Sequence, residues 1–282
     1  MKKLLCLLLV LPLSAVSVAR DSARQDAVIM PVIMYHTILN SRDGVYIVSE
    51  AQLENDLKEL IARGYEFVFP SEVAEFVSGE GSLPEKPVML TFDDGHYNNL
   101  YYGLPILEKY GAKANINIIG RFSEYTTASG DVDNPNYSHL TWEEIATMWD
   151  SGVFEVGNHT YDMHNYKPRY GIAPKSGESE EAYRAALKSD ISRLQEKIYA
   201  AANRYPTTFA YPFGKYNDVA REVLASLGFT VMMTCNEGVN VLRKGETERL
   251  SYIKRYNRSG RYSTRDFLDR IARDEKKARE SL

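Results

Sequence analysis

Short apolar runs alternate with longer stretches of helical periodicity along most of the chain. Eight runs have the β-branched and aromatic content of buried strands, at residues 32–35, 65–69, 88–92, 114–119, 154–156, 208–211, 229–234 and 251–256. Between them, Ser49 with Gln52 and Thr141 with Glu144 form capping-box patterns, which are typical of helix starts. The chain therefore repeats a strand-then-helix order.

The longest predicted helix covers residues 180 to 203. Its apolar residues recur at three- and four-residue spacing and form one buried face: Tyr183, Leu187, Ile191, Leu194 and Ile198. The charged residues of the same stretch occupy the opposite, solvated face.

Strand-then-helix repetition predicts an α/β fold with parallel strands, either closed into a barrel or open as a doubly wound sheet. The apolar pattern alone does not choose between the two. Polar residues follow several predicted strands at their carboxyl ends, where both architectures locate their chemistry: His36, Asp93, Asp94, His159, His164, Pro212, Phe213, Arg255 and Arg258. Such a ring of strand-end groups favours a barrel.

The first nineteen residues have the pattern of an export signal. Lys2 and Lys3 precede an apolar run at residues 4–18, and small residues at 17–19 form a cleavage site. An uncleaved membrane anchor is the alternative, and either interpretation locates the rest of the chain outside the cytoplasm.

Composition narrows the partners and the number of domains. Removing Lys2 and Lys3 changes the formal charge from -4 to -6, and no basic run remains that could track a phosphate backbone. We therefore expect no nucleic-acid partner. No linker rich in Pro, Ser or Gly divides residues 20–282, so we expect a single domain.

Two adjacent carboxylates, Asp93 and Asp94, directly follow the apolar run 88–92 in "LTFDDGHYNN". Without a cation their repulsion would raise one pKa, whereas a divalent ion would keep both ionised. "GNHTYDMHN" supplies His159 and His164, which a helix would separate by about 140 degrees, so only a loop brings both to one ion. One Asp and two His leave a coordination position for water. The alternatives are a simple "DDG" turn or helix cap and two surface histidines.

The ordered motifs "TFDDG", "HT" with a second His five residues after the first, and "AYPFG" resemble the polysaccharide deacetylases of carbohydrate esterase family 4, those with the NodB homology domain. The resemblance extends from residue 31 to residue 257. The histidine spacing is similar to that of the poly-N-acetylglucosamine deacetylase branch. This resemblance implies a distorted (β/α) barrel of seven to eight strands and one divalent metal ion, usually zinc, with cobalt or nickel in some members.

The same resemblance implies roles for individual residues. Asp93 would be the catalytic base, and the backbone N–H of Phe213 would stabilise the oxyanion formed when water attacks the acetamide. The metal ligands would be Asp94, His159 and His164.

Two positions depart from the family pattern. Most relatives protonate the leaving amine with a histidine near the end of the domain, but no histidine follows His164 in this chain. His36 is therefore our candidate for the general acid. The alternative is that His36 is a buried structural histidine. Ala210 stands where the family usually has an arginine that orients the base. Arg255 is the candidate replacement, with an ordinary surface arginine as the alternative.

Flat rings pack against sugar faces, which suggests substrate contacts beside these motifs. The candidates for substrate binding are Tyr161, Tyr211, Pro212 and Arg255. Tyr166, Tyr170 and the polar segment 167–178 flank the histidine motif and are further candidates for a groove. His96 and His139 are assigned surface or structural roles.

The sequence thus predicts a metal-dependent hydrolase, secreted or associated with the cell envelope, that removes N-acetyl groups from amino sugars of peptidoglycan or a poly-N-acetylglucosamine-like polymer. The alternatives are a deacetylase of chitin fragments, O-acyl esters or a non-sugar amide, and a carbohydrate-binding relative without catalysis. We expect a carbohydrate partner and a monomeric protein.

Overall fold

The computed structural model describes residues 27–41, 44–130 and 132–282. The predicted export signal at residues 1–19 lies outside this part of the chain. Among the described residues, no helix combines the length and the apolarity that a membrane span requires.

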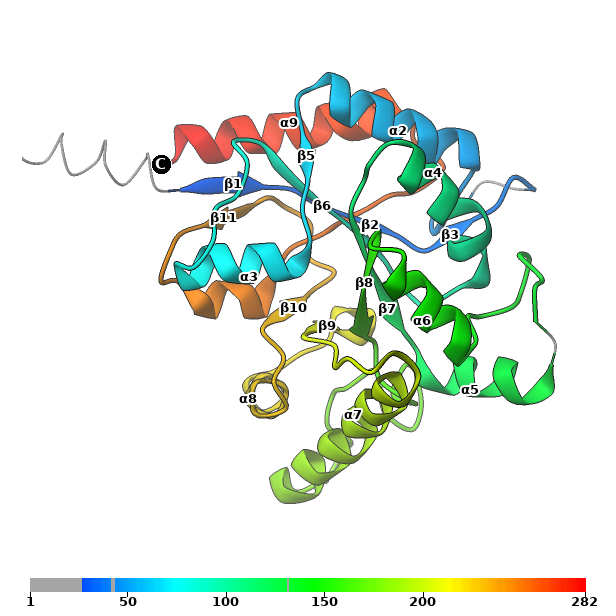
Figure 1. The fold of residues 1–282 in the computed structure, drawn as a ribbon. Coiled ribbons are helices and arrows are strands. Elements are labelled where there is room, and N and C mark those ends of the chain that lie inside the picture. Colours follow the sequence, from blue (N-terminus) through cyan, green and yellow to red (C-terminus); the bar gives the residue numbers. More distant parts are fainter. Residues whose placement is uncertain (1–26, 42–43, 131) are drawn as a thin grey trace, which may run out of the picture.

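A curled parallel sheet forms the centre of the molecule (Figure 1). Its strands run in the order β10-β9-β8-β7-β6-β2-β12, with β5 beside the start of β6, and every pairing is parallel. The bounds are β2 Val32–Tyr35, β5 Glu66–Phe67, β6 Pro87–Phe92, β7 Ala114–Ile118, β8 Phe154–Asn158, β9 Thr208–Ala210, β10 Val231–Met233 and β12 Tyr256–Asn257. An isolated parallel bridge joins Met233 to Ile253, so the two ends of the sheet approach each other. The predicted distorted (β/α) barrel is confirmed.

The first seven predicted strands each overlap an observed strand. The eighth, at residues 251–256, is wrong over most of its length. The 3-10 helix η3 (Thr247–Tyr252) occupies its start, and only its last residue enters β12. Ile253 instead donates its N–H to Met232 and accepts from Thr234, which holds this segment as a loop against β10.

Two small strand pairs were not expected from the sequence. β1 (Val28–Met30) pairs antiparallel with β11 (Asn240–Leu242), and β3 (Thr37–Ile38) pairs with β4 (Ile47–Val48). Strands of two or three residues are too short to show an alternating pattern.

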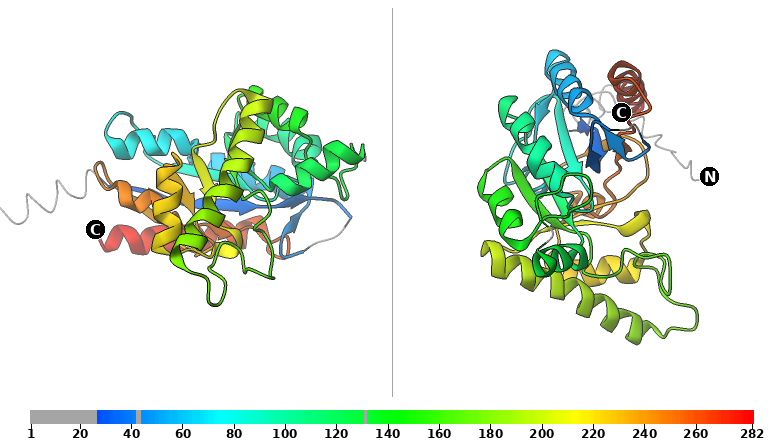
Figure 2. Two further views of the ribbon diagram at one scale, coloured as in Figure 1. Left: turned by 90° about the horizontal axis from the view of Figure 1, so that it is seen from below. Right: turned by 90° about the vertical axis from the view of Figure 1, so that its right-hand side faces the viewer.

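Helices surround the sheet. They are α2 Glu50–Ala62, α3 Pro70–Ser78, α4 Leu104–Lys109, α5 Gly120–Ser129, α6 Trp142–Asp150, α7 Glu180–Ala202, α8 Asp218–Ser226 and α9 Thr264–Glu280, with the π-helical turn η1 Asn99–Gly103 and the 3-10 turn η2 Pro212–Gly214. Figures 1 and 2 show α2 beside α9 on one side of the molecule, and α6, α7 and α8 side by side near β8 and β9. Both predicted capping boxes are confirmed, as is the buried face of α7.

The strand ends are fixed by packing beneath them. All six residues of β6 are buried, and the Phe92 ring stacks on Tyr35 at 5.0 Å and meets Phe154 edge-on at 5.5 Å. A buried ion pair between Arg258 and Asp56, with Nε to Oδ2 at 2.7 Å, joins the segment after β12 to α2. These contacts hold the strands β2 and β6, which are followed directly by His36 and Asp93.

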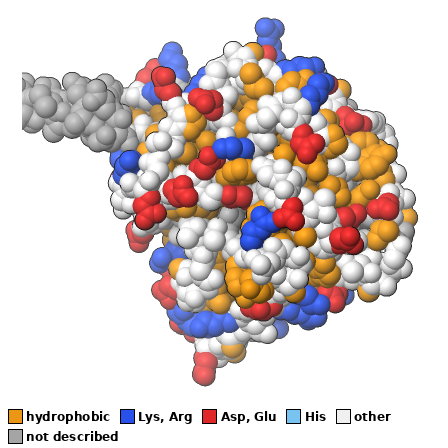
Figure 3. All heavy atoms as spheres, in the orientation of Figure 1, with side chains coloured by type: hydrophobic (Ala, Val, Ile, Leu, Met, Phe, Trp, Pro, Cys, Tyr) orange, Lys and Arg blue, Asp and Glu red, His pale blue; other side chains and the backbone are white. Residues whose placement is uncertain are grey.

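The surface carries charges of both signs. On the face drawn in Figure 3, acidic and basic side chains are intermixed, and neither sign covers a large area by itself.

Candidate functional site

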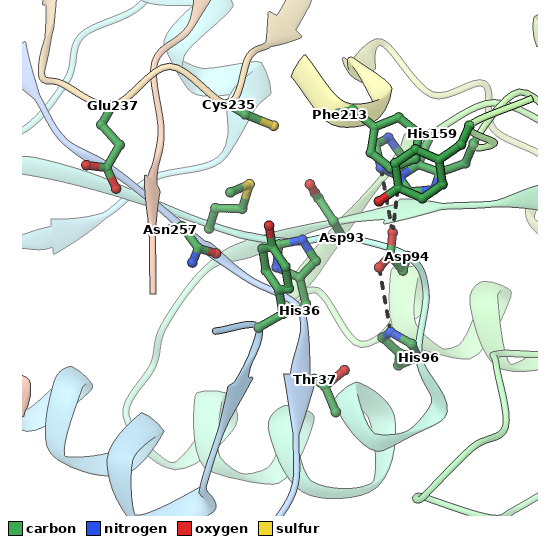
Figure 4. A pocket seen from close by; sticks show the side chains of 14 residues that line it. His36, Thr37, Asp93, Asp94, His96, His159, Phe213, Cys235, Glu237 and Asn257 are labelled. Atoms are coloured by element: carbon green, nitrogen blue, oxygen red, sulfur yellow. Dashed lines mark ion pairs between the residues drawn. The ribbon is translucent and has the colours of Figure 1, made fainter. Parts of the chain in front are cut away.

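Segments that follow four strands of the sheet deliver side chains to one pocket of about 370 Å³ (Figure 4). Its lining includes residues from the segments after β2, β6, β8 and β9: His36, Asp93, Asp94, His159, His164 and Phe213. Parallel strands expose their carboxyl ends at the same edge of a sheet, which brings together residues far apart in the sequence. The sequence-based expectation of a strand-end cluster is therefore realised.

The backbone at this edge is strained. Among the described residues, five that are not glycine have positive φ, and three of them lie in or beside the pocket: Asp94 at 74°, Thr160 at 72° and Phe213 at 55°. Each such residue costs about 1–3 kcal/mol and persists only where surrounding contacts impose it. Backbone strain of this kind concentrates at functional sites.

Asp94, His159 and His164 form a cluster with the donor set of a metal site. Each offers one ligand atom within 4.8 Å of the others; the Nε2 atoms of His159 and His164 lie 3.7 and 3.9 Å from Asp94 Oδ1. That oxygen is buried and has no hydrogen-bond partner. Because a buried carboxylate oxygen is rarely left unpaired, a cation between these three atoms fits the residues present.

The protonation of the cluster also suits a cation. His159 Nδ1 donates to the Ala210 carbonyl oxygen at 2.7 Å, which leaves the Nε2 lone pair facing Asp94. Burial lowers the pKa of His159 to about 4, so this ring is neutral at pH 7. Burial opposes ionisation of Asp94, but a hydrogen bond from His96 and the electrostatic effect of His36 outweigh it and hold the pKa of Asp94 below its ordinary value. The cluster thus presents one carboxylate and a neutral imidazole nitrogen.

The neighbouring carboxylate, Asp93, is locked in place. Arg255 donates from Nη1 to Oδ1 and from Nη2 to Oδ2, both at 2.8 Å, and Asn117 Nδ2 donates to Oδ1 at 2.8 Å. Burial tends to raise the pKa of Asp93, but the Arg255 charge outweighs it and lowers the pKa to about 2. Oδ1 accepts two of these bonds and Oδ2 only one, so Oδ2 has more capacity to accept another proton.

His36 faces the same space from the end of β2. Its Nδ1 atom is buried without a hydrogen-bond partner, and its ring lies 4.7 Å from that of Tyr46. Burial lowers the pKa of His36, although the nearby Asp94 and Asp93 charges act in the opposite direction. The structure brings His36 to the pocket, as predicted, and leaves one ring nitrogen unengaged.

Neighbouring elements hold the loop that carries both site histidines. Asp190, from α7, accepts from the backbone N–H groups of Tyr161 and Asp162 at 2.8 and 2.9 Å. The N–H groups of Gly120 and Arg121, at the start of α5, donate to the carbonyl oxygens of Thr160 and Tyr161. Donors and acceptors on two helices therefore fix a loop that has no regular structure of its own.

The four residues predicted to contact the substrate are buried in the structure. The rings of Tyr161 and Tyr211 lie in the core, 7% and 0% exposed, and Pro212 is also buried, so none offers a flat face to a sugar. Arg255 is fully buried and contacts Asp93, not the open pocket.

An aromatic group borders the pocket instead. Tyr166 is 72% exposed and lines the pocket, and its ring stacks on Phe213 at 4.6 Å. Tyr170 stacks on the same Phe213 ring at 5.0 Å. Of the tyrosines near the histidine loop, these two are the exposed ones.

Sequence reasoning missed several residues of the site. Asn117, which donates to Asp93, is a polar residue on the largely apolar strand β7, and this departure from the apolar pattern was a usable signal. His96 lies two residues after Asp94, and its Nε2 is 3.7 Å from Asp94 Oδ2 (Figure 4), so it is not a remote surface residue. Nothing in the local sequence of Cys235 or Glu237 indicated that they would line the pocket.

Known proteins resemble this chain in sequence and in fold. It is 28% identical over 209 residues to YxkH of Bacillus subtilis (strain 168), which is named as a polysaccharide deacetylase; the match covers 74% of this chain and 65% of that protein. It is 28% identical over 188 residues to the poly-beta-1,6-N-acetyl-D-glucosamine N-deacetylase of Staphylococcus aureus (strain MRSA252), covering 65% and 59% of the two chains. The chain spans less than two thirds of the length of these relatives.

A solved structure matches over most of the chain. The Streptococcus pyogenes deacetylase PplD in complex with acetate superposes with a TM-score of 0.68 at 25% identity, covering 86% of this chain and 97% of that one. The family model described as polysaccharide deacetylase matches residues 80–232, which is more than half of the sequence. This chain therefore belongs to the polysaccharide deacetylase family.

Proposed function

We propose that this protein is a metal-dependent N-deacetylase that hydrolyses the acetamide of N-acetylated amino sugars within a polysaccharide. The observation that carries the proposal is the juxtaposition, in one pocket, of the Asp94, His159 and His164 cluster with the locked carboxylate of Asp93. A carbohydrate-binding relative without catalysis would have no need of a buried carboxylate held by Arg255 and Asn117.

A divalent ion would be held by Asp94 Oδ1, His159 Nε2 and His164 Nε2. When bound there, it would polarise the acetamide carbonyl and make a water molecule more acidic. Zinc matches this donor set, and cobalt or nickel are the alternatives.

Asp93 is the general base in this mechanism. Its Oδ2 atom takes the proton of the attacking water, while Arg255 and Asn117 keep the carboxylate from turning. A pKa of about 2 keeps Asp93 ionised at neutral pH, so it is ready to accept a proton before substrate arrives.

Two further groups act on the tetrahedral intermediate. The backbone N–H of Phe213, in a residue with φ of 55°, stabilises the developing oxyanion. His36 gives a proton to the departing amine, which requires the ring to be charged when substrate is bound. Burial alone disfavours that charge, and the two neighbouring carboxylates favour it.

The proposed substrate class is a β-1,6-linked poly-N-acetylglucosamine or a similar envelope polymer. The name of the Staphylococcus aureus relative, a poly-beta-1,6-N-acetyl-D-glucosamine N-deacetylase, supports it, as does the spacing between His159 and His164. Peptidoglycan and chitin fragments are competing substrates. The signal-like residues 1–19 support an extracytoplasmic location, and we propose that the protein acts there as a monomer.

Acetate release from a defined β-1,6-linked N-acetylglucosamine pentamer tests the proposal. Asp93→Asn should lower kcat by roughly 10²–10⁴-fold, because it removes the base without changing its shape. Asp218→Asn, a change of the same kind at a side chain that is 84% exposed, should leave turnover unchanged. Activity on O-acetyl esters alone, or full turnover of the pentamer by Asp93→Asn, would refute the assignment.

Metal content gives a separate measurement. The purified protein should bind about one divalent ion per chain. His164→Ala should bind it much less tightly, whereas Asp218→Asn should retain it. Unchanged metal content in His164→Ala would show that the ligand assignment is wrong.

A further inference from the structure

A second cavity, of about 350 Å³, lies between α5 and the segment that precedes α6. Its lining includes the rings of Phe122, Tyr125, Tyr137 and His139, with Arg121 and Thr126 beside them. Tyr125 is 71% exposed, Tyr137 57% and Phe122 39%. Three large aromatic side chains are therefore gathered in one surface hollow where water reaches them.

The buried face of α5 does not include its aromatic residues. The buried residues of this helix are all small, namely Gly120, Ser123 and Thr126. A surface helix normally turns its large apolar residues towards the core, but α5 directs Phe122 and Tyr125 the other way. The packing of α5 thus does not account for its aromatic residues. Exposed aromatic groups that fold packing does not require are typical of ligand sites.

The cavity adjoins the active-site pocket through two imidazole rings. The His139 ring lies 4.5 Å from Phe122 and 4.8 Å from the ring of His96. His96 lines the active-site pocket, on the side of Asp94 away from His159 (Figure 4). The two cavities therefore lie next to each other, with the contacting rings of His96 and His139 between them.

The backbone around this wall is fixed. His96 and His139 form an isolated antiparallel bridge, Leu140 donates its N–H to Gly95, and Tyr97 donates to Ser138. These hydrogen bonds fix the position of the two cavities relative to each other, because they join the turn after Asp94 to the segment that lines the second cavity.

We propose that this second cavity is a sugar-binding subsite, which takes a pyranose ring of the polymer beyond the residue being deacetylated. The inference rests on the proposed function and extends it to the neighbouring sugars. A pyranose has an apolar face of C–H groups, which packs on an aromatic ring, and an edge of hydroxyl groups, which needs polar partners. The rings of Tyr125 and Tyr137 provide the first, and the Arg121 guanidinium, whose Nη1 is paired with Asp162, provides its other N–H donors for the second. The subsite would make the enzyme prefer polymers to short substrates.

Two substrates of different length test this proposal. The β-1,6-linked pentamer of N-acetylglucosamine offers several sugar rings besides the one that reacts, whereas 4-methylumbelliferyl acetate has no sugar ring that could occupy the second cavity. Tyr125→Ala should raise KM for the pentamer by roughly two- to tenfold, the range expected for one lost ring-stacking contact. Its kcat, and all kinetics with the small ester, should stay as in the unchanged protein. Tyr125→Trp should retain the pentamer KM because it retains a flat ring.

The matched control is Tyr199→Ala. Tyr199 is a 40% exposed tyrosine on α7 that stacks on Tyr205, outside both cavities. It should change neither substrate's kinetics. If Tyr125→Ala leaves the pentamer KM unchanged, or raises KM for the small ester to the same extent, the subsite is refuted while the deacetylase function stands.

Pentamer binding measured by calorimetry separates the subsite from the catalytic proposal. In an Asp93→Asn background, Tyr125→Ala should weaken pentamer binding by the same two- to tenfold. If the protein releases no acetate from any substrate but binding still depends on Tyr125, the subsite stands and the catalytic proposal fails. Equal pentamer affinities with and without the Tyr125 ring would overturn the subsite whatever the enzyme activity.

Discussion

Replacing Arg255 by methionine should destabilise the fold as well as abolish activity. The guanidinium is completely buried and supplies two of the three hydrogen bonds that Asp93 accepts. In Arg255→Met, the Asp93 carboxylate would remain in the core with only the amide of Asn117. Leaving one partner of a buried ion pair without the other costs about 3–5 kcal/mol. For a protein of this size, that corresponds to a decrease in Tm of roughly 6–20 °C.

The depressed pKa of Asp93 leads to a pH dependence of this stabilisation. Its value of about 2 in the folded protein lies below the unfolded value of about 3.9, and this difference corresponds to about 2–3 kcal/mol. Because the folded pKa is depressed, this stabilisation is present above pH 4 and is lost as the pH falls towards 2. In Arg255→Met the depression disappears and burial raises the pKa of Asp93. The stability difference between the two proteins should therefore shrink as the pH falls from about 5 to 3.

Urea denaturation in the presence of a chelator measures these free energies without a contribution from bound metal. Arg261→Met, the same substitution at an exposed arginine near Arg255, is the control and should change stability by less than about 0.5 kcal/mol. The double variant Asp93→Asn/Arg255→Met should recover much of the loss, because neither charge then remains buried alone. Additive losses in the double variant, or a stability difference that does not vary with pH, would refute this account of the ion pair.

Three further predictions concern the surroundings of the site. Gly157→Ala would bring a Cβ to 2.1 Å from Asn117 Oδ1 and displace the Asn117 amide from Asp93. The kcat should therefore fall, and the free energy of unfolding should drop by about 1–3 kcal/mol. Unchanged kcat and stability would contradict this. Asp190→Ala should weaken metal binding about 10–100-fold in a chelator competition, because the loop that carries the site histidines loses its two hydrogen bonds to Asp190. Asp190→Asn, which keeps one acceptor oxygen, should weaken metal binding less. Equal metal affinities in all three proteins would exclude this role of Asp190. Burial raises the pKa of Asp190 to about 6, so the contribution of this group to stability is fully present below about pH 3.9 and is lost as the pH rises through 6. Between pH 4 and 7, Asp190→Asn should therefore lose less stability than the unchanged protein. Parallel pH profiles of the two proteins would contradict this.

The sequence was sufficient for the order of the elements because buried parallel strands are apolar throughout and stand out from amphipathic helices. The cluster of Asp94, His159 and His164 followed from the same pattern, since each of these residues comes after a strand end. The pattern failed at residues 251–256, where apolar side chains are buried by a 3-10 turn and a loop and not by strand pairing.

Orientation and burial of individual rings could not be predicted. Tyr161 and Tyr166 lie in the same loop, yet one is 7% exposed and the other 72%. The Tyr161 ring packs into the core with Arg193 over it at 3.7 Å, whereas the Tyr166 ring stacks on Phe213 at the edge of the pocket. The bond between Asn117 and Asp93 depends on the register of β6 and β7, which a single sequence does not specify. The sequence left open whether Arg255 contacts Asp93 or lies on the surface. The pairing of β12 with β2, which the sequence does not specify, places Arg255 next to Asp93.

The pairing of β12 with β2 also bears on how the protein is made. A chain synthesised from its amino terminus exposes Asp93 long before residue 255 leaves the ribosome, and until then that carboxylate has no counter-ion to accompany it into the interior. We expect the edge of the sheet that carries Asp93 to be the last part of the molecule to become ordered. A shortened product that ends before β12 should remain incomplete there, even though it retains the motifs "TFDDG", "HT" and "AYPFG" between residues 90 and 214.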